Sequence, residues 1–394
     1  MSIKVGVGLC KSNDPILAAK EALRKAANQL AGEKAELAIV FSSFNLSFPV
    51  LLKTLSEFLE EVPIVGCSSA AVISNAEISK QGLVIMLLSF SEETFFNTAC
   101  AKEINTTADS GEKLGEELLY GFQNVRRDLG IIFLDGLLEN SSNLLSGLQE
   151  RLGKSFPIIG GCASDNLAFK KTYVYFNQEM LSDAASGILL GGKLTFGVGV
   201  QHGWKPLGKP RYITKSSANV VSEIDNLPAA NIYEDYLACG LEKIRKEFKR
   251  ISILYPIGIY LPGEKEYLLR NLLSIHDDGS LTFQGGVPQG SQIRLMIGTK
   301  ESCLAATEQA LEEVKNEFLG KKINFVLVFN SISRYILLGR QANKELEIIR
   351  KGLGQEIPII GIYTYGELAP LKAIDYQGVT RFHNQTITIL GVGI

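Results

Sequence analysis

Apolar and polar positions follow two periods along this chain, and the two periods alternate in a fixed order. Apolar runs rich in Ile, Val, Leu and Phe at Leu37–Ser43, Leu129–Asp135 and Phe325–Ser331 have the length of buried strands. Behind each run come apolar residues spaced three or four positions apart, which is the spacing of one helix face. The pattern predicts a strand followed by a helix at three places.

A short string recurs after each of these predicted helices. It begins Pro-Ile, continues with Val or Ile and reaches Gly at its fourth position, in Pro63–Ser68, Pro157–Cys162 and Pro358–Tyr363. Proline suits the first residue of a strand because no ladder hydrogen bond is needed there. Glycine allows a positive φ or a close approach of the backbone to a ligand. The sequence therefore predicts an internal repeat of strand, helix and short strand.

The remaining segments complete the predicted fold. A first helix begins at Pro15, with Asp14 as its N-cap. Closely spaced strands between residues 171 and 214 favour an antiparallel meander, and residues 232–248 have the pattern of one amphipathic helix. The predicted fold class is α/β, with mixed sheets covered by helices, pseudo-repeated strand-helix-strand units and two packed halves.

The spacing of the repeats bears on the domain boundaries. The long gap between the second and third copies leaves room for a fourth, and Pro256–Tyr260 falls near its midpoint. That segment lacks a preceding strand, so a fourth unit is not favoured. The turn signal Asp225–Pro228 instead predicts a boundary between a domain of residues 1–228 and a domain of residues 229–394.

The charge balance of the chain disfavours partners that carry a strong negative charge. The chain has 40 basic and 42 acidic side chains and a net charge of −2, so neither nucleic acid nor an anionic membrane is an expected partner. The N-terminus has no charged segment followed by an apolar one, and the longest apolar run, residues 82–90, is half the length of a bilayer span. We expect a cytoplasmic protein without membrane insertion.

The sequence contains only partial matches to metal-binding and catalytic motifs. No two of the six cysteines form a CxxC pair, so we expect reduced thiols and no metal site. Gly66–Ala70 lacks the second glycine of a nucleophile elbow, and Gly6–Gly8 and Gly197–Gly199 lack the rest of a phosphate-binding loop. Cys67 or Cys162 would need a nearby base to act as a nucleophile. No catalytic residue is predicted, and a thiol-dependent enzyme is an alternative.

Several strings, taken in order, resemble one protein family. They are Gly66–Ala70, Gly160–Asp165, His202–Gly208 and Asp225–Tyr236 in the first half, and Val287–Gly290, Arg294–Met296, Phe329–Arg334 and Gly361–Glu367 in the second. This order is similar to the N-terminal and C-terminal halves of the FIST domain, named for F-box and intracellular signal transduction proteins. The resemblance covers nearly the whole chain.

The resemblance implies a sensory module rather than an enzyme. Such domains occur alone or joined to kinases and chemoreceptors, and they are thought to bind small ligands such as amino acids. Since no output domain is attached, a signalling protein partner in trans is expected. Some members are reported to bind haem and sense nitric oxide, so a haem-binding sensor using His202 or His383 is an alternative to a protein without a cofactor. Ala71-Val72 and Ser331 depart from the family pattern, so the ligand's identity does not transfer.

The loops after the repeated strands carry the predicted site, because α/β sheets bind ligands at strand ends. The predicted ligand-binding residues are Gly66, Cys67, Ser68, Ser69, Gly161, Cys162, Ser164, Asp165, Arg334, Tyr363, Thr364, Tyr365, Gly366 and Glu367. Arg334 would pair with a small carboxylate, and Asp165 or Glu367 would receive an ammonium group. The alternatives are an internal ion pair between Arg334 and Glu367, and a purely structural protein.

Overall fold

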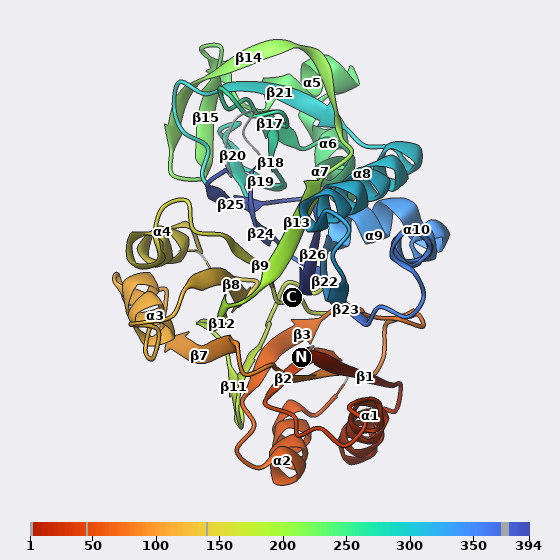
Figure 1. The fold of residues 1–394 in the computed structure, drawn as a ribbon. Helices are drawn as coiled ribbons and strands as arrows, with labels where there is room; N and C mark the ends of the chain where they lie inside the picture. The colour runs from red at the N-terminus through yellow and green to blue at the C-terminus, as the bar shows by residue number, and fades with distance from the viewer. Residues whose placement is uncertain (1–2, 45, 139–140, 372–377) are drawn as a thin grey trace.

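Three similar sheets and one smaller domain make up the molecule (Figure 1). The computed structural model describes residues 3–44, 46–138, 141–371 and 378–394. Three six-stranded sheets enclose a common apolar core and carry helices on their outer faces, and a fourth sheet of eight strands lies at one end. This architecture confirms the predicted mixed α/β class.

The first sheet lies at the bottom of Figure 1 and has the order β1–β6–β2–β3–β10–β11. These strands are, in that order, Lys4–Cys10, Leu83–Ser89, Leu37–Ser43, Ile64–Ser69, Val174–Phe176 and Glu179–Leu181. Helices α1 (Pro15–Gln29) and α2 (Phe48–Leu59) pack on its outer face. The Asp14 carboxylate accepts the backbone N–H groups of residues 16 and 17, which confirms the predicted N-cap.

The second and third sheets repeat this plan at the left and right of Figure 1. The second, β25–β24–β9–β8–β12–β7, consists of Thr380–His383, Glu367–Pro370, Ile158–Cys162, Arg127–Leu134, Ala184–Gly192 and Thr94–Lys102, with α3 (Ser110–Leu118) and α4 (Ser141–Leu152). The third, β13–β26–β22–β23–β4–β5, consists of Thr195–Gln201, Ile387–Gly393, Ile323–Ser331, Ile359–Thr364, Val72–Ser74 and Ile78–Ser79, with α8 (Lys300–Phe318), α9 (Ile332–Leu338), a 3-10 turn (Gly339–Gln341) and α10 (Asn343–Leu353).

The three sheets exchange hairpins in a cycle. Each strand that carries the repeated string pairs in parallel with the strand before its helix, so that β3 pairs with β2, β9 with β8 and β23 with β22. The other edge of each is filled from a different repeat: β10 joins β3, β24 joins β9 and β4 joins β23. The three strings are therefore equivalently placed, as the repeat predicts.

The glycine in each string serves strand packing. A Cβ on Gly66 or Gly160 would lie 1.8 Å, and one on Gly361 2.2 Å, from a carbonyl oxygen of the parallel partner strand. The close approach that the sequence predicts is thus made to protein backbone. On the inner face, Phe41 and Phe133 pack with ring centroids 5.4 Å apart, and Phe329 lies 6.2 Å from Phe133.

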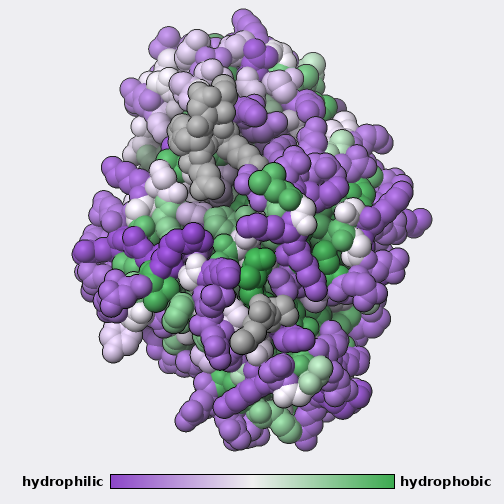
Figure 2. Space-filling model, viewed as in Figure 1, coloured by the Kyte–Doolittle hydropathy of each residue, from purple (hydrophilic) through white to green (hydrophobic). Residues whose placement is uncertain are grey.

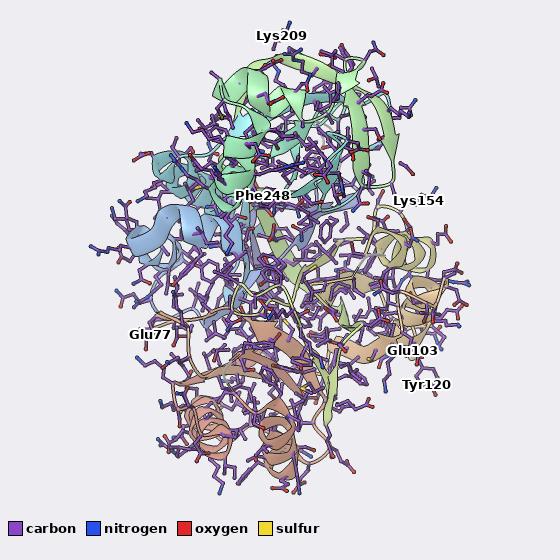
Figure 3. The ribbon with its side chains drawn as sticks, turned by 180° about the vertical axis from the view of Figure 1, so that it is seen from behind. Glu77, Glu103, Tyr120, Lys154, Lys209 and Phe248 are labelled. Carbon is purple, nitrogen blue, oxygen red and sulfur yellow. The ribbon has the colours of Figure 1, made fainter. Side chains whose placement is uncertain are left out.

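A smaller domain is inserted between β13 and α8. Its strands are β14 (Lys205–Ser217), β15 (Val220–Ile224), β16 (Leu227–Pro228), β17 (Ile257–Ile259), β18 (Leu268–Arg270), β19 (Leu272–Ile275), β20 (Leu281–Phe283) and β21 (Gln292–Ile297), and its helices are α5 (Asn231–Leu237), α6 (Leu241–Lys246) and α7 (Phe248–Leu254). It has its own apolar core. Figure 3 shows Lys209 at its outer tip.

Two local predictions are wrong. The strands between residues 171 and 214 form no meander, because β10, β12, β13 and β14 belong to four different sheets. The predicted helix over residues 232–248 is broken after α5, where Ala238 has a φ of +48° and Gly240 is extended. Pro256–Tyr260 contains β17, whose partners β18 and β21 are both antiparallel, so it is not a fourth repeat.

Strand pairs cross the boundary predicted near residue 228. β4 pairs with β23, β24 with β9 and β13 with β26, and each pair joins a strand before the boundary to one after it. The two halves of the chain therefore pack through shared sheets. No helix in the described ranges is long and apolar enough to cross a bilayer. The face in Figure 2 is largely hydrophilic, with apolar patches near its middle.

Candidate functional site

The ends of the three repeated strands, with the residues that follow them, converge and hydrogen-bond to one another. Ser69 Oγ lies 2.6 Å from the carbonyl oxygen of Ala71 and 3.0 Å from that of Tyr363, to which Ser164 Oγ also donates. Ser68 Oγ lies 3.1 Å from the Ser164 carbonyl oxygen. All three serines are buried. Their hydroxyl groups hold the loops together.

Asp165 organises the loop that follows the second repeated strand. Its carboxylate accepts the backbone N–H groups of residues 168–171 at 2.9 to 3.4 Å and the hydroxyl of Tyr365. Burial alone would raise the pKa of Asp165, but these hydrogen bonds outweigh burial and lower it. The Phe169 ring stacks on Tyr365 with centroids 4.3 Å apart. Asp165 thus anchors this loop as a carboxylate.

Glu367 is a buried carboxyl group in an otherwise apolar position of the repeat. Glu367 pairs with the residue after the repeated glycine of β9, and the residues that pair at the equivalent position of the other two repeated strands are Val72 in β4 and Val174 in β10. The Glu367 side chain accepts the Thr364 hydroxyl, and at 2.7 and 3.1 Å the hydroxyl and N–H of Thr386. Burial disfavours its charge and raises its pKa to about 7.

Arg334 forms a buried ion pair with Glu345, which differs from both roles predicted for it. Its Nη2 lies 2.6 Å from Glu345 Oε1, and the guanidinium also donates to the carbonyl oxygens of His202 and Cys303 and to the Thr307 hydroxyl. Burial opposes the charge of Arg334, but Glu345 outweighs that effect and raises its pKa. Arg334 is fully buried. Its donors are directed at protein groups, and Glu367 is not among them.

The predicted residues are brought together only in part. Ser68, Ser69, Ser164 and Tyr363 share one network, Asp165 pairs with Tyr365, Thr364 pairs with Glu367, and Arg334 joins a separate cluster. The predicted glycines Gly161 and Gly366 pack closely against Thr364 and Phe382. None of the predicted residues lines the five best-formed pockets of the described ranges.

The cysteines and histidines are poorly placed for chemistry. All six cysteines are free, as expected, and burial raises the pKa of both Cys67 and Cys162. His202 accepts the Trp204 N–H and lies 3.1 Å from the Glu266 carboxylate, while His383 Nε2 lies 3.0 Å from a carbonyl oxygen. Burial lowers the pKa of His383 to about 3. Within the described ranges no three potential metal-ligating side chains gather.

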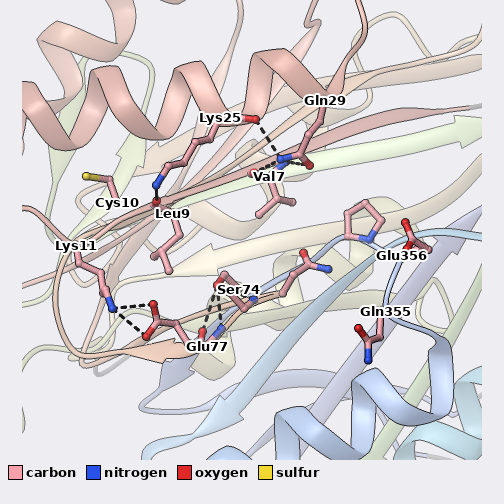
Figure 4. Close-up of a pocket in the computed structure, with 13 residues that line it drawn as sticks. Val7, Leu9, Cys10, Lys11, Lys25, Gln29, Ser74, Glu77, Gln355 and Glu356 are labelled. Carbon is pink, nitrogen blue, oxygen red and sulfur yellow. Dashed lines mark hydrogen bonds and ion pairs between the residues drawn. The ribbon is translucent and has the colours of Figure 1, made fainter.

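A pocket of about 510 Å³ opens where the first and third sheets meet (Figure 4). We call such a junction, between the edge strand of one sheet and the hairpin filling the next, a seam. Residues from β1, α1, the β4–β5 hairpin and the loop before β23 line it: Val7, Leu9, Cys10, Lys11, Lys25, Gln29, Ser74, Asn75, Ala76, Glu77, Gln355, Glu356 and Pro358. The other seams carry pockets of about 460 Å³ at β7 and Phe176, and of about 40 Å³ at β13 and Pro157.

The matches to protein families agree with this architecture. Residues 36–227 match the FIST N domain and residues 229–370 match the FIST C domain. The chain therefore belongs to the FIST family, whose domains are associated with sensing in signal transduction.

Relatives and similar structures extend over most of the chain. An uncharacterized protein of Methanocaldococcus jannaschii is 24% identical over 385 residues, 88% of this chain and 71% of that protein. One of Mycobacterium bovis is 23% identical over 383 residues, 94% and 95% of the two chains. The structure of cyanuric acid hydrolase from A. caulinodans covers 98% of this chain and 99% of its own, with a TM-score of 0.38 and 9% identity. That degree of likeness assigns no activity here.

Sequence reasoning missed the pocket residues, although a signal for them existed. The Gly6-Val7-Gly8 string is the edge strand β1, where a Cβ on Gly6 or Gly8 would lie 2.0 or 1.9 Å from a carbonyl oxygen of α1. This close packing lays α1 over the strand edge, so Lys25 Nζ donates to the Leu9 oxygen at 2.8 Å and the Gln29 amide bonds the Val7 backbone. A Gly-x-Gly strand beside an amphipathic helix therefore marks this seam.

Proposed function

We propose that the protein is a sensor that binds a small polar ligand, an amino acid or similar small carboxylate, and signals to a partner protein. One observation carries this proposal: the largest described seam pocket has walls from both family halves. The β4–β5 hairpin belongs to the FIST N match, and Gln355, Glu356 and Pro358 belong to the FIST C match. The remaining wall is formed by β1 and α1, which precede the FIST N match. A ligand held there would contact both halves at once.

The strand exchange supports a signalling role for such a ligand. The β4–β5 hairpin lines the pocket and pairs with β23 of the other half. A ligand that prefers one spacing of this seam would shift the population of that arrangement, because differential affinity is what moves such an equilibrium. The surface around the seam would then differ between the free and bound protein, which gives a partner something to recognise.

Binding is favoured over catalysis by the state of the reactive groups. Ser68 and Ser69 donate to backbone carbonyl groups, and the buried thiols of Cys67 and Cys162 have raised pKa values, so these four predicted residues are not activated as nucleophiles. Six free thiols suit a reducing compartment such as the cytoplasm.

A thermal-shift screen of the purified protein tests the proposal. The panel contains the twenty amino acids and common small carboxylic acids. A true ligand at 100 times its dissociation constant should raise the free energy of unfolding by about 2.7 kcal/mol. A panel without any shift would favour a structural role, and an absorption band that appears on haem addition would favour the haem-binding alternative.

A further inference from the structure

In the pocket where the first and third sheets meet, some polar side chains already form hydrogen bonds or ion pairs, and others can still form them. The Gln29 amide bonds both backbone groups of Val7 at 2.7 and 3.2 Å. The Asn75 amide bonds the carbonyl oxygen of residue 357 and the N–H of Ile359. Lys11 and Glu77 form an ion pair at 2.8 Å. These groups shape the pocket.

Two oppositely charged side chains retain capacity. The Lys25 ammonium group makes one hydrogen bond, to the Leu9 oxygen at 2.8 Å, and an ammonium group has three donors. No ion pair or hydrogen bond of Glu356 occurs within the part of the chain that the structure describes. Figure 4 shows Lys25 on the α1 side and Glu356 on the loop before β23, and Val7, Leu9 and Pro358 supply apolar lining.

We propose that this pocket is the ligand site and that it binds a small dipolar metabolite carrying both a carboxylate and an amino group. The carboxylate pairs with Lys25 on one wall, the ammonium group faces Glu356 on the other, and the apolar part of the ligand rests on Val7 and Leu9. This inference rests on the proposed function and adds the position of the site and its recognition chemistry.

Cys10 gives a local readout for occupancy. Cys10 is half-buried and is one of the residues that line the pocket, and Figure 4 shows its thiol on the α1 side, near the Lys25 ammonium group. Cys100 and Cys239 have similar intermediate exposure but do not line it, and Cys67 and Cys162 are buried. A ligand in this pocket should slow the alkylation of Cys10 by a maleimide, followed by peptide mass spectrometry. The rates at Cys100 and Cys239 should stay unchanged.

The decisive experiment combines the protection of Cys10 from alkylation with variants that remove a single lysine charge. The probes are the amino acid that gives the largest thermal shift in the panel of twenty, the matching acid without its amino group, and the matching amine without its carboxylate. Lys25→Met should weaken the amino acid by about tenfold or more, the scale of one charge-assisted hydrogen bond. Lys20→Met is the matched control, since Lys20 lies on α1 outside the pocket, and it should bind normally.

The outcomes separate this inference from the function on which it rests. The site is supported if the amino acid protects Cys10 from alkylation, if its affinity falls in Lys25→Met, and if it binds more tightly than both probes that lack one charged group. An amino acid that stabilises the protein without protecting Cys10, and binds Lys25→Met equally well, overturns the site while the sensor function stands. Equal affinity for the acid without its amino group overturns the dipolar ligand class. A panel without any thermal shift overturns the proposed function and the site together.

Discussion

A single buried carboxyl group should give this protein an unusual dependence of stability on pH. The pKa of Glu367 rises from 4.5 to about 7 in the folded chain because burial penalises its charge. A raised carboxyl pKa contributes stability that is complete below pH 4.5 and is lost as pH rises to about 7. At about 1.4 kcal/mol per pKa unit, the loss is on the order of 3 kcal/mol. Urea unfolding at several pH values measures it.

Glu367→Gln isolates this contribution. Glutamine keeps the shape and hydrogen-bonding capacity of the protonated acid but does not titrate. The difference in unfolding free energy between the variant and the wild type should therefore grow in favour of the variant between pH 4.5 and 7, while the other carboxyl groups cancel. Parallel pH profiles for the two proteins would contradict the raised pKa.

The buried Arg334–Glu345 pair should matter far more to stability than an exposed pair. Arg334→Ala leaves Glu345 as an uncompensated buried charge, which costs about 3 to 5 kcal/mol. Lys102→Ala breaks the half-exposed pair with Glu179 and should cost about 1 kcal/mol or less. Chemical denaturation of both variants makes the comparison. Similar costs would show that Arg334 is not held as an ion pair.

At the scale of elements, the repeated glycine should be intolerant of a side chain. A Cβ on Gly160 would lie 1.8 Å from the Ile132 carbonyl oxygen, so Gly160→Ala must push β8 and β9 apart. We expect a loss of about 3 kcal/mol or more. Gly240 has a negative φ and open space around its Cβ position, so Gly240→Ala should change stability by no more than about 1 kcal/mol. Thermal melts of the two variants test the contrast.

Local patterns predict elements well here and their partners poorly. The strand Leu37–Ser43 and the start of α1 at Pro15 are where the sequence puts them, because side-chain period and capping are local properties. The meander fails because the sequence between residues 171 and 214 contains nothing that says which sheet each strand joins. The predicted ion pair between Arg334 and Glu367 is wrong for a similar reason, because the sequence does not show which acidic side chain lies beside Arg334. Its partner in the structure is Glu345, eleven residues away on α10.

The whole molecule explains why the predicted residues do not line an open pocket together. The repeat brings the ends of the three strands together, as predicted, but the serine side chains there are buried, and their hydroxyl groups donate to backbone carbonyl oxygens of the neighbouring segments. The two largest described pockets lie instead at seams, where strands of different repeats meet edge to edge. Residues such as Lys25 look like ordinary exposed helix positions until the strand exchange places a second wall opposite them.

The strand exchange also predicts that neither family half folds independently. A fragment of residues 1–228 would leave β4, β9 and β13 without β23, β24 and β26, and unpaired strand edges promote aggregation. Each fragment expressed alone should therefore be aggregated or lack a cooperative melt. Co-expression of 1–228 with 229–394 should restore a stable complex with one transition, since every missing pair is then available. Size-exclusion chromatography and circular dichroism distinguish the cases, and a monomeric 1–228 fragment that melts cooperatively would show that the shared sheets are not essential to the fold.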